Sequence, residues 1–184
     1  MQDPRRQPIP ISQRRIDLLF VAFFLLNFGF ITYVVDLEQL VIADPARFNY
    51  PLWPPAPLVD LVHWYGDRFD PLLMARPPFW RMTIWIDVLY FGPFYLAGSY
   101  AFLRGRDWIR VPALVWPGLM LANVLIILTE ERYGAWATPH FPIVLALNLP
   151  WLLLPAAMIW RMRHDHPFTT VAAPAPTSDS LSVR

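Results

Sequence analysis

Four polar side chains interrupt apolar stretches of the sequence and could carry chemistry: Asp36, Asp87, Asn123 and Asn148. An ionisable group within an apolar span is costly and marks a candidate functional site. A buried carboxyl group can exchange a proton with a substrate or pair with a cation. Buried Asn side chains have a competing role, because they also join helices through hydrogen bonds. We therefore interpret Asp87 as a candidate ligand contact, leave both roles open for Asp36 at the end of its span, and expect each asparagine, taken alone, to join helices.

Aromatic residues flank these positions and could complete a pocket. The π face of an aromatic ring attracts a cation, so carboxylates among aromatic rings suit a cationic ligand with an apolar body. Each ring taken singly is more simply explained by packing. The residues are Tyr33, Tyr90, Phe94, Trp116 and Trp151.

The composition indicates a membrane protein. Of 184 residues, 56% are hydrophobic and 16% are charged, and a chain this short cannot hide so much apolar surface in one aqueous core. The net charge of +1 and the scattered basic residues argue against a nucleic-acid partner. The absence of cysteine excludes disulfides and thiolate metal sites. The four histidines lack metal-ligand spacing and no phosphate-binding loop is found, so we expect no metal and no cofactor.

Four apolar stretches approach or exceed the length of about 20 residues that spans a bilayer. Since lipid leaves few other ways to satisfy the backbone, we expect helices. The predicted fold is all-α, a four-transmembrane-helix bundle with proline-kinked helices and a long outer loop between helices 1 and 2. The predicted spans are 16–35, about 79 or 82 to 103, 111–129 and 141–160, and the prolines are Pro93, Pro117, Pro150 and Pro155.

The remaining segments differ in character. We expect a loose polar N-terminal segment over 1–15, a four-helix membrane domain over 16–162 and a disordered tail over 163–184, which is rich in Ala, Pro, Ser and Thr. Within the first connector, the amphipathic stretch Leu58 to Phe69 predicts a short helix over the mouth of the bundle. The acidic pair Glu130–Glu131 is interpreted as a solvated helix end.

The arginines predict the orientation. With the N-terminus inside, nine arginines lie on the cytoplasmic side and five on the other, so both termini are expected in the cytoplasm. At a rise of ~1.5 Å per residue, Asp87 lies ~12 Å, Asn123 ~9 Å and Asn148 ~10 Å below the outer end of its span. With Asp36 at the outer end of the first span, every helix presents a polar group to the outer half of the membrane.

Several sequence runs resemble the EXPERA-domain family. LVHWYGDRFDPLLMARPPFW (58–80), YFGPFYLAGSYAFLRG (90–105) and WIRVPAL (108–114) are similar to its sigma-two receptor branch, which is related to the emopamil-binding sterol isomerase. ILTEERYG (127–134) and NLPWLLLP (148–155) resemble the isomerase branch at least as well. The resemblance extends over about 16–162.

The resemblance implies a cavity that opens sideways to lipid and binds sterols and cationic amphiphiles. It implies that Asp36 contacts the ligand head, and we expect Asp70 of the DPLL motif to share a proton with Asp36. It further implies a possible homodimer, in the endoplasmic reticulum of a eukaryote or the inner membrane of a bacterium. The implied ligand-binding residues are Asp36, Asp70, Asp87, Trp116, Asn123, Asn148 and Trp151.

Two other functions stay open. The first is a steroid or isoprenoid double-bond isomerase, in which Asp36, Asp70 and Asp87 serve as acids and bases and Trp151 stabilises a carbocation. In that branch a first-helix histidine takes part, and Phe28 stands at the matching place here. The second is a structural or chaperone-like membrane protein without a ligand, for which replacing Asp87 by leucine would leave or raise stability.

Overall fold

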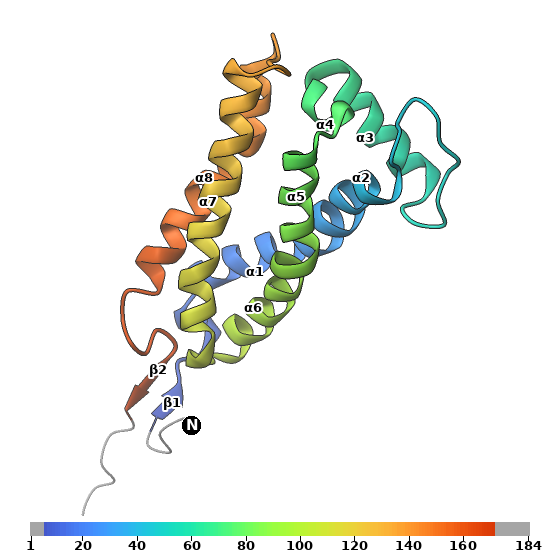
Figure 1. Cartoon of the computed structure of the whole chain (residues 1–184). Coiled ribbons are helices and arrows are strands. Elements are labelled where there is room, and N and C mark those ends of the chain that lie inside the picture. Colours follow the sequence, from blue (N-terminus) through green and yellow to red (C-terminus); the bar gives the residue numbers. More distant parts are fainter. Residues whose placement is uncertain (1–5, 172–184) are drawn as a thin grey trace, which may run out of the picture.

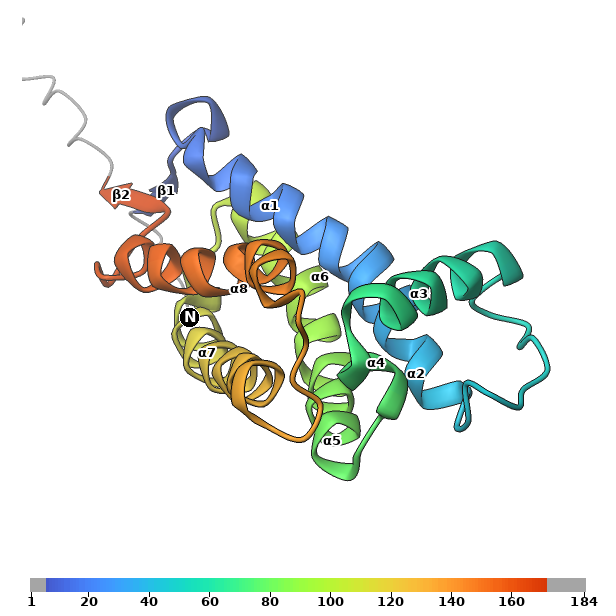
Figure 2. The same ribbon diagram turned by 90° about the horizontal axis from the view of Figure 1, so that it is seen from above.

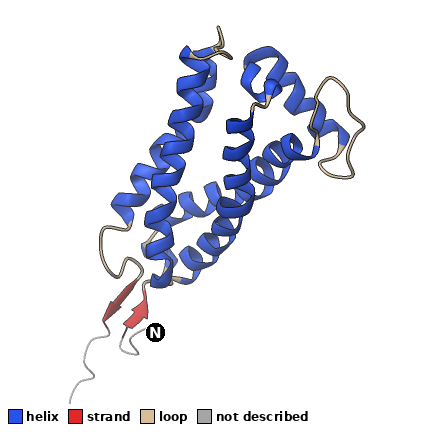
Figure 3. Ribbon diagram, viewed as in Figure 1, coloured by secondary structure: helices blue, strands red, loops and turns tan. Residues whose placement is uncertain are grey.

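Helices dominate the structure, a computed structural model that describes residues 6–171 (Figure 3). The first helical rod consists of α1 (Ile16–Leu26), η2 (Asn27–Asp36) and α2 (Leu37–Val41). The second consists of α5 (Pro78–Ile86), η3 (Asp87–Phe91) and α6 (Gly92–Arg104). The others are η4 (Asp107–Ile109) with α7 (Arg110–Tyr133), and α8 (Phe141–Arg161). Within residues 6–171, three helices are long and apolar enough to cross a membrane: Ile16–Val41, Asp107–Tyr133 and Phe141–Arg161.

The rods pack as two pairs, α1 against α6 and α7 against α8, as both views show (Figures 1 and 2). The first rod ends at Val41, six residues beyond the predicted end of the first span. The predicted span stopped at residue 35 because polar residues follow it. In the structure Glu38 and Gln39 are buried, and they accept hydrogen bonds from Arg76 and Trp80. Polar residues paired inside the protein therefore extend the helix.

Two further helices lie over the ends of α2 and α5, on the part of the bundle away from β1 (Arg6–Pro8) and β2 (Thr169–Val171) (Figure 1). They are α3 (Ala56–Phe69) and α4 (Pro71–Ala75). The predicted amphipathic helix over 58–69 is confirmed as part of α3, which buries Val59 and Val62 on one face. Only 42–55 of the first connector forms an extended stretch without helix or strand. Most of the expected long loop is thus helical.

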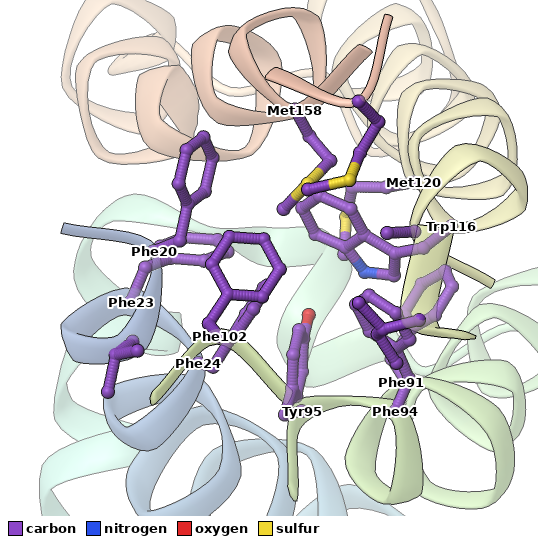
Figure 4. Packing of buried hydrophobic residues seen from close by; sticks show 14 of the residues in the cluster. Phe20, Phe23, Phe24, Phe91, Phe94, Tyr95, Phe102, Trp116, Met120 and Met158 are labelled. Carbon is purple, nitrogen blue, oxygen red and sulfur yellow. The ribbon is translucent and has the colours of Figure 1, made fainter. Parts of the chain in front are cut away.

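An aromatic core holds together the half of the bundle nearer β1 and β2. Phe20 and Phe24 from α1 meet Phe102 of α6 at centroid distances of 5.5 Å. Phe94 stacks on Trp116 at 5.5 Å with an interplanar angle of 14° (Figure 4). The close approach of α1 to α6 requires Gly98, where an added Cβ would lie 2.9 Å from the Phe24 ring.

Two segments of the rods, η2 and η3, are π-helical instead of α-helical. Helices α7 and α8 run through Pro117, Pro150 and Pro155. In contrast, η2 ends at Asp36 and η3 begins at Asp87. Pro93, just after η3, has no N–H to donate. Such π segments frequently occur at functional sites.

A small antiparallel sheet joins the two ends of the described chain. Strand β1 (Arg6–Pro8) pairs with β2 (Thr169–Val171), with Gln7 opposite Thr170. After β1 follows the short helix η1 (Ile11–Gln13). The all-α expectation is therefore wrong in this detail.

The expectation of a loose start over 1–15 and a disordered tail over 163–184 is also wrong for 6–15 and 163–171. Phe168 is fully buried, and the guanidinium groups of Arg14 and Arg161 lie 5.1 and 4.8 Å from its ring centroid. Both guanidinium groups also pair with the buried Asp17. Residues 1–5 and 172–184 lie outside the described residues.

Candidate functional site

A cavity of about 210 Å³ lies in the half of the bundle away from β1 and β2, between the two helix pairs and next to α3 and α4. Every long rod contributes to its wall. Six of the seven sequence-predicted site residues line it: Asp36, Asp70, Asp87, Asn123, Asn148 and Trp151. The predicted polar layer thus corresponds to the wall of a single cavity.

Asp36 and Asp87 form a carboxyl pair where the two π segments meet. Their side chains are hydrogen-bonded to each other, and the Thr32 hydroxyl donates a 2.6 Å hydrogen bond to Oδ1 of Asp87. A hydrogen bond between two carboxyl groups requires one of them to be protonated. The two adjoining carboxyl groups therefore form an acidic centre that could meet a cation or a hydroxyl group.

Asp70 is fixed by the start of α4. Its Oδ1 accepts a 3.0 Å hydrogen bond from the Leu73 amide as the N-cap of that helix, and Pro71 occupies the first helical position. This arrangement of cap and proline is a strong helix-start signal. Burial raises the pKa of Asp70, while the amides of Leu73 and Leu72 and the side chain of Glu131 oppose the rise. The DPLL motif thus presents a buried carboxyl group to the cavity.

The partner of Asp70 is Glu131 rather than the expected Asp36. Glu131 interacts with the Asp70 side chain, lines the cavity and is 1% exposed. The expectation of a solvated Glu130–Glu131 helix end is therefore wrong for Glu131. The sequence contained a signal for the place of Glu131 on the cavity wall. At a spacing of four residues, one helix face carries Asn123, Ile127 and Glu131.

The cavity wall contains four carboxyl groups and, among residues 6–171, no arginine or histidine. The nearby Arg76 has its donors directed elsewhere. It donates hydrogen bonds to both oxygens of Glu38, at 3.0 and 2.8 Å, and to the carbonyls of Ile42 and Leu73. The acidic groups of the cavity therefore lack a basic side chain to neutralise them.

The aromatic wall differs from the expected one. Trp151 lines the cavity, and its indole N–H donates a 2.8 Å hydrogen bond to Oδ1 of Asn27 on the first rod. The other aromatic wall residues are Tyr65, Trp80 and Phe91. Burial raises the pKa of the Tyr65 hydroxyl.

The remaining expected aromatic residues lie away from the cavity wall. Trp116 and Phe94 stack in the aromatic core, because both lie on the faces that pack against α1. Tyr33 donates to the Val88 carbonyl at 3.1 Å, and Tyr90 is 37% exposed.

Asn148 on the cavity wall is hydrogen-bonded within its own helix. Asn148 donates a 2.9 Å hydrogen bond to the Val144 carbonyl one turn earlier in its own helix. Both asparagines face the cavity. Among residues 6–171, no group of three or more His, Asp or Glu side chains could hold a metal ion.

These features define a helical membrane protein with an acidic cavity enclosed by its helices. Residues 57–162 match the family model EXPERA (EXPanded EBP superfamily). Because this match covers more than half of the chain, the protein belongs to the EXPERA family.

The similarity to individual relatives extends over most of this chain and most of each relative. The chain is similar to sigma intracellular receptor 2 of Xenopus tropicalis, with 27% identity over 165 residues, covering 83% of this chain and 90% of the relative. Identity is 28% to the protein of that name from Macaca fascicularis and 29% to that from Homo sapiens, over 82% of this chain and 89% and 88% of those proteins.

Proposed function

We propose that this protein binds the cationic or hydroxyl head of a sterol-like amphiphile in its acidic cavity, as the family membership favours. The single observation that supports this most is a cavity with four carboxyl groups and, in the described part of the chain, no basic group on its wall. Buried carboxylates without counter-charge are strongly disfavoured. A cation that enters with its own apolar body provides that charge.

The cavity volume limits how much of the ligand is enclosed. Small-molecule pockets usually have volumes of about 300–1,000 Å³, so a cavity of about 210 Å³ suits a head group and the adjoining ring. The rest of the apolar body would extend between the helices to the lipid. Trp151 would pack against the body, and Asp36 would contact the head.

The proposed topology has four membrane crossings. Strands β1 and β2 pair, so both ends of the described chain lie on the same side of a membrane, which requires an even number of crossings. Three helices meet the criteria of length and composition. We assign the fourth crossing to the rod 78–104, whose lower hydropathy is explained by Asp87 and the aromatic residues that it carries. The arginine distribution favours cytoplasmic termini, in the endoplasmic reticulum of a eukaryote or the inner membrane of a bacterium.

Direct binding tests this proposal. Tritiated cholestanylamine should bind to the purified protein, and Asp36→Asn should abolish that binding. Asp67→Asn is the matched control, because Asp67 is an exposed aspartate on α3 outside the cavity wall. Equal affinity of the Asp36→Asn variant and the wild type would reject the assignment. Native mass spectrometry of the same sample would test the homodimer and any co-purified lipid.

A second candidate function, the double-bond isomerase, is favoured by the adjoining carboxyl groups of Asp36 and Asp87 in the same cavity as Trp151. The protonated carboxyl group would add its proton to an alkene carbon. The resulting carbocation would rest against the indole, and a carboxylate would remove a proton from the neighbouring carbon. Incubation with an unsaturated sterol in heavy water distinguishes the two functions, because only catalysis places deuterium in the sterol.

A further inference from the structure

The cavity contains two separate carboxyl pairs. One is Asp36–Asp87, where the first and second rods meet. The other is Asp70–Glu131, between the start of α4 and the outer turn of α7. Recognition of a single amine requires only the first pair, so the second pair needs an explanation of its own.

Structural bonding does not account for Glu131. Apart from the Asp70 carboxyl group beside it, neither carboxyl oxygen of Glu131 has a hydrogen-bond partner among residues 6–171. The side chain is nevertheless 1% exposed and faces the cavity. Leaving a buried acceptor unpaired is costly. A donor from outside the protein would satisfy it.

The negative charges of the cavity indicate how many cationic groups of a ligand it can bind. Two adjacent carboxyl groups cannot both ionise easily, so each pair keeps one proton and carries one negative charge. Two pairs then place two negative charges in one cavity. Arg76, the basic group near Asp70, is already bonded to Glu38, Ile42 and Leu73.

We propose that the preferred ligand is a sterol-like amphiphile with two basic nitrogens, one bound at Asp36–Asp87 and the other at Asp70–Glu131. This inference rests on the proposed amine-binding function and specifies its substrate class. Each ammonium would donate hydrogen bonds to one pair, and Tyr65 would flank the second nitrogen from α3. Glu131 then determines specificity rather than amine binding as such.

Matched ligands test the proposal. Binding of N-(aminobutyl)cholestanylamine, which has two amines, is compared with that of N-butylcholestanylamine, which has one amine and nearly the same size. The diamine should bind to the wild type about 10-fold or more tightly than the monoamine, as expected for one further desolvated charge pair. A series of spacers from aminopropyl to aminohexyl should show one optimum.

The ratio of the two affinities in Glu131→Gln completes the test. The diamine advantage should disappear in Glu131→Gln and persist in Glu130→Gln, because Glu130 lies outside this cavity wall. An advantage that survives in Glu131→Gln overturns the proposal, and so does a wild type that binds both amines equally or shows no dependence on the spacer. If neither amine binds to the wild type, amine binding itself fails together with this inference. The spacer series uses only the wild type and does not depend on the folding of any variant.

Discussion

The Thr32 hydroxyl donates a 2.6 Å hydrogen bond to Asp87, a residue 55 positions further along the chain. This bond joins the two π-helical segments and fixes the position of the carboxyl group that pairs with Asp36. The irregular helical turns of both rods are thus connected at the cavity. Asp87 therefore contributes to the bundle as well as to the candidate site.

Replacing Asp87 by leucine distinguishes a ligand site from a plain scaffold. The variant should lose about 1–3 kcal/mol of stability, because Thr32 and Asp36 lose a buried hydrogen-bond partner. It should also lose the thermal protection that cholestanylamine gives to the wild type. Thermal unfolding in detergent, with and without the amine, measures both effects. Unchanged or raised stability would favour the structural, chaperone-like alternative.

Asp70 should make stability depend on pH. Because its pKa in the folded protein is raised above the ordinary 3.8, the folded protein holds this proton more tightly than the unfolded chain. The resulting stability is complete below pH 3.8 and decreases as the pH rises through the raised value. Asp70→Asn keeps a good N-cap and should flatten this part of the profile, whereas Asp67→Asn should not. Melting curves over a pH series measure the slope, and identical slopes in wild type and Asp70→Asn would contradict the assignment.

The buried ion pair of Glu38 and Arg76 should be sensitive to the loss of one partner. Arg76→Gln should lower the free energy of unfolding by about 3–5 kcal/mol, because it removes the guanidinium that bonds both oxygens of the buried Glu38 and leaves only His63, at 2.9 Å from Glu38 Oε1, beside that carboxylate. The double variant Arg76→Gln with Glu38→Gln should recover part of the loss. Arg68→Ala, at an exposed position on α3, is the control. A double variant less stable than Arg76→Gln alone would refute this explanation.

Two glycines should respond oppositely to alanine. Gly98→Ala should destabilise the bundle by about 1–3 kcal/mol, because its Cβ would lie 2.9 Å from the Phe24 ring. Gly118→Ala should be neutral or stabilise by up to about 1 kcal/mol, since nothing lies within 4 Å of its added Cβ. Denaturant unfolding of the two variants measures both signs. A stabilised Gly98→Ala would show that α1 and α6 can move apart.

The cavity wall could be predicted from the sequence where a polar residue interrupts an apolar run. Asp87, Asn123 and Asn148 stand out in this way, and all of them line the cavity. Glu131 does not, because its neighbours Glu130 and Arg132 make it resemble an ordinary polar helix end. Which carboxyl groups pair also depends on distances between rods, and no pattern within a single rod determines those distances.

The fold, too, could be predicted only in part from the sequence. Long apolar stretches predicted the rods. Strands β1 and β2, in contrast, consist of three residues each and form only because the ends of the bundle bring them together. Trp116 lies one turn from the cavity residue Met120 on the same face of α7, but its ring packs in the aromatic core against Phe24 and Phe94. How far a cavity extends along a helix face depends on the side chains of the neighbouring helices, which the sequence of one helix does not determine.

The pairing of Gln7 with Thr170 also makes the protein convenient for engineering. The sequence contains no cysteine, so a cysteine introduced at each of these positions would be the only thiols available for a spin label or a crosslinker. A disulfide between them would close a covalent loop that contains nearly all of the described chain. A single backbone cleavage in another loop, such as the stretch after Val41, would then leave the two fragments covalently joined.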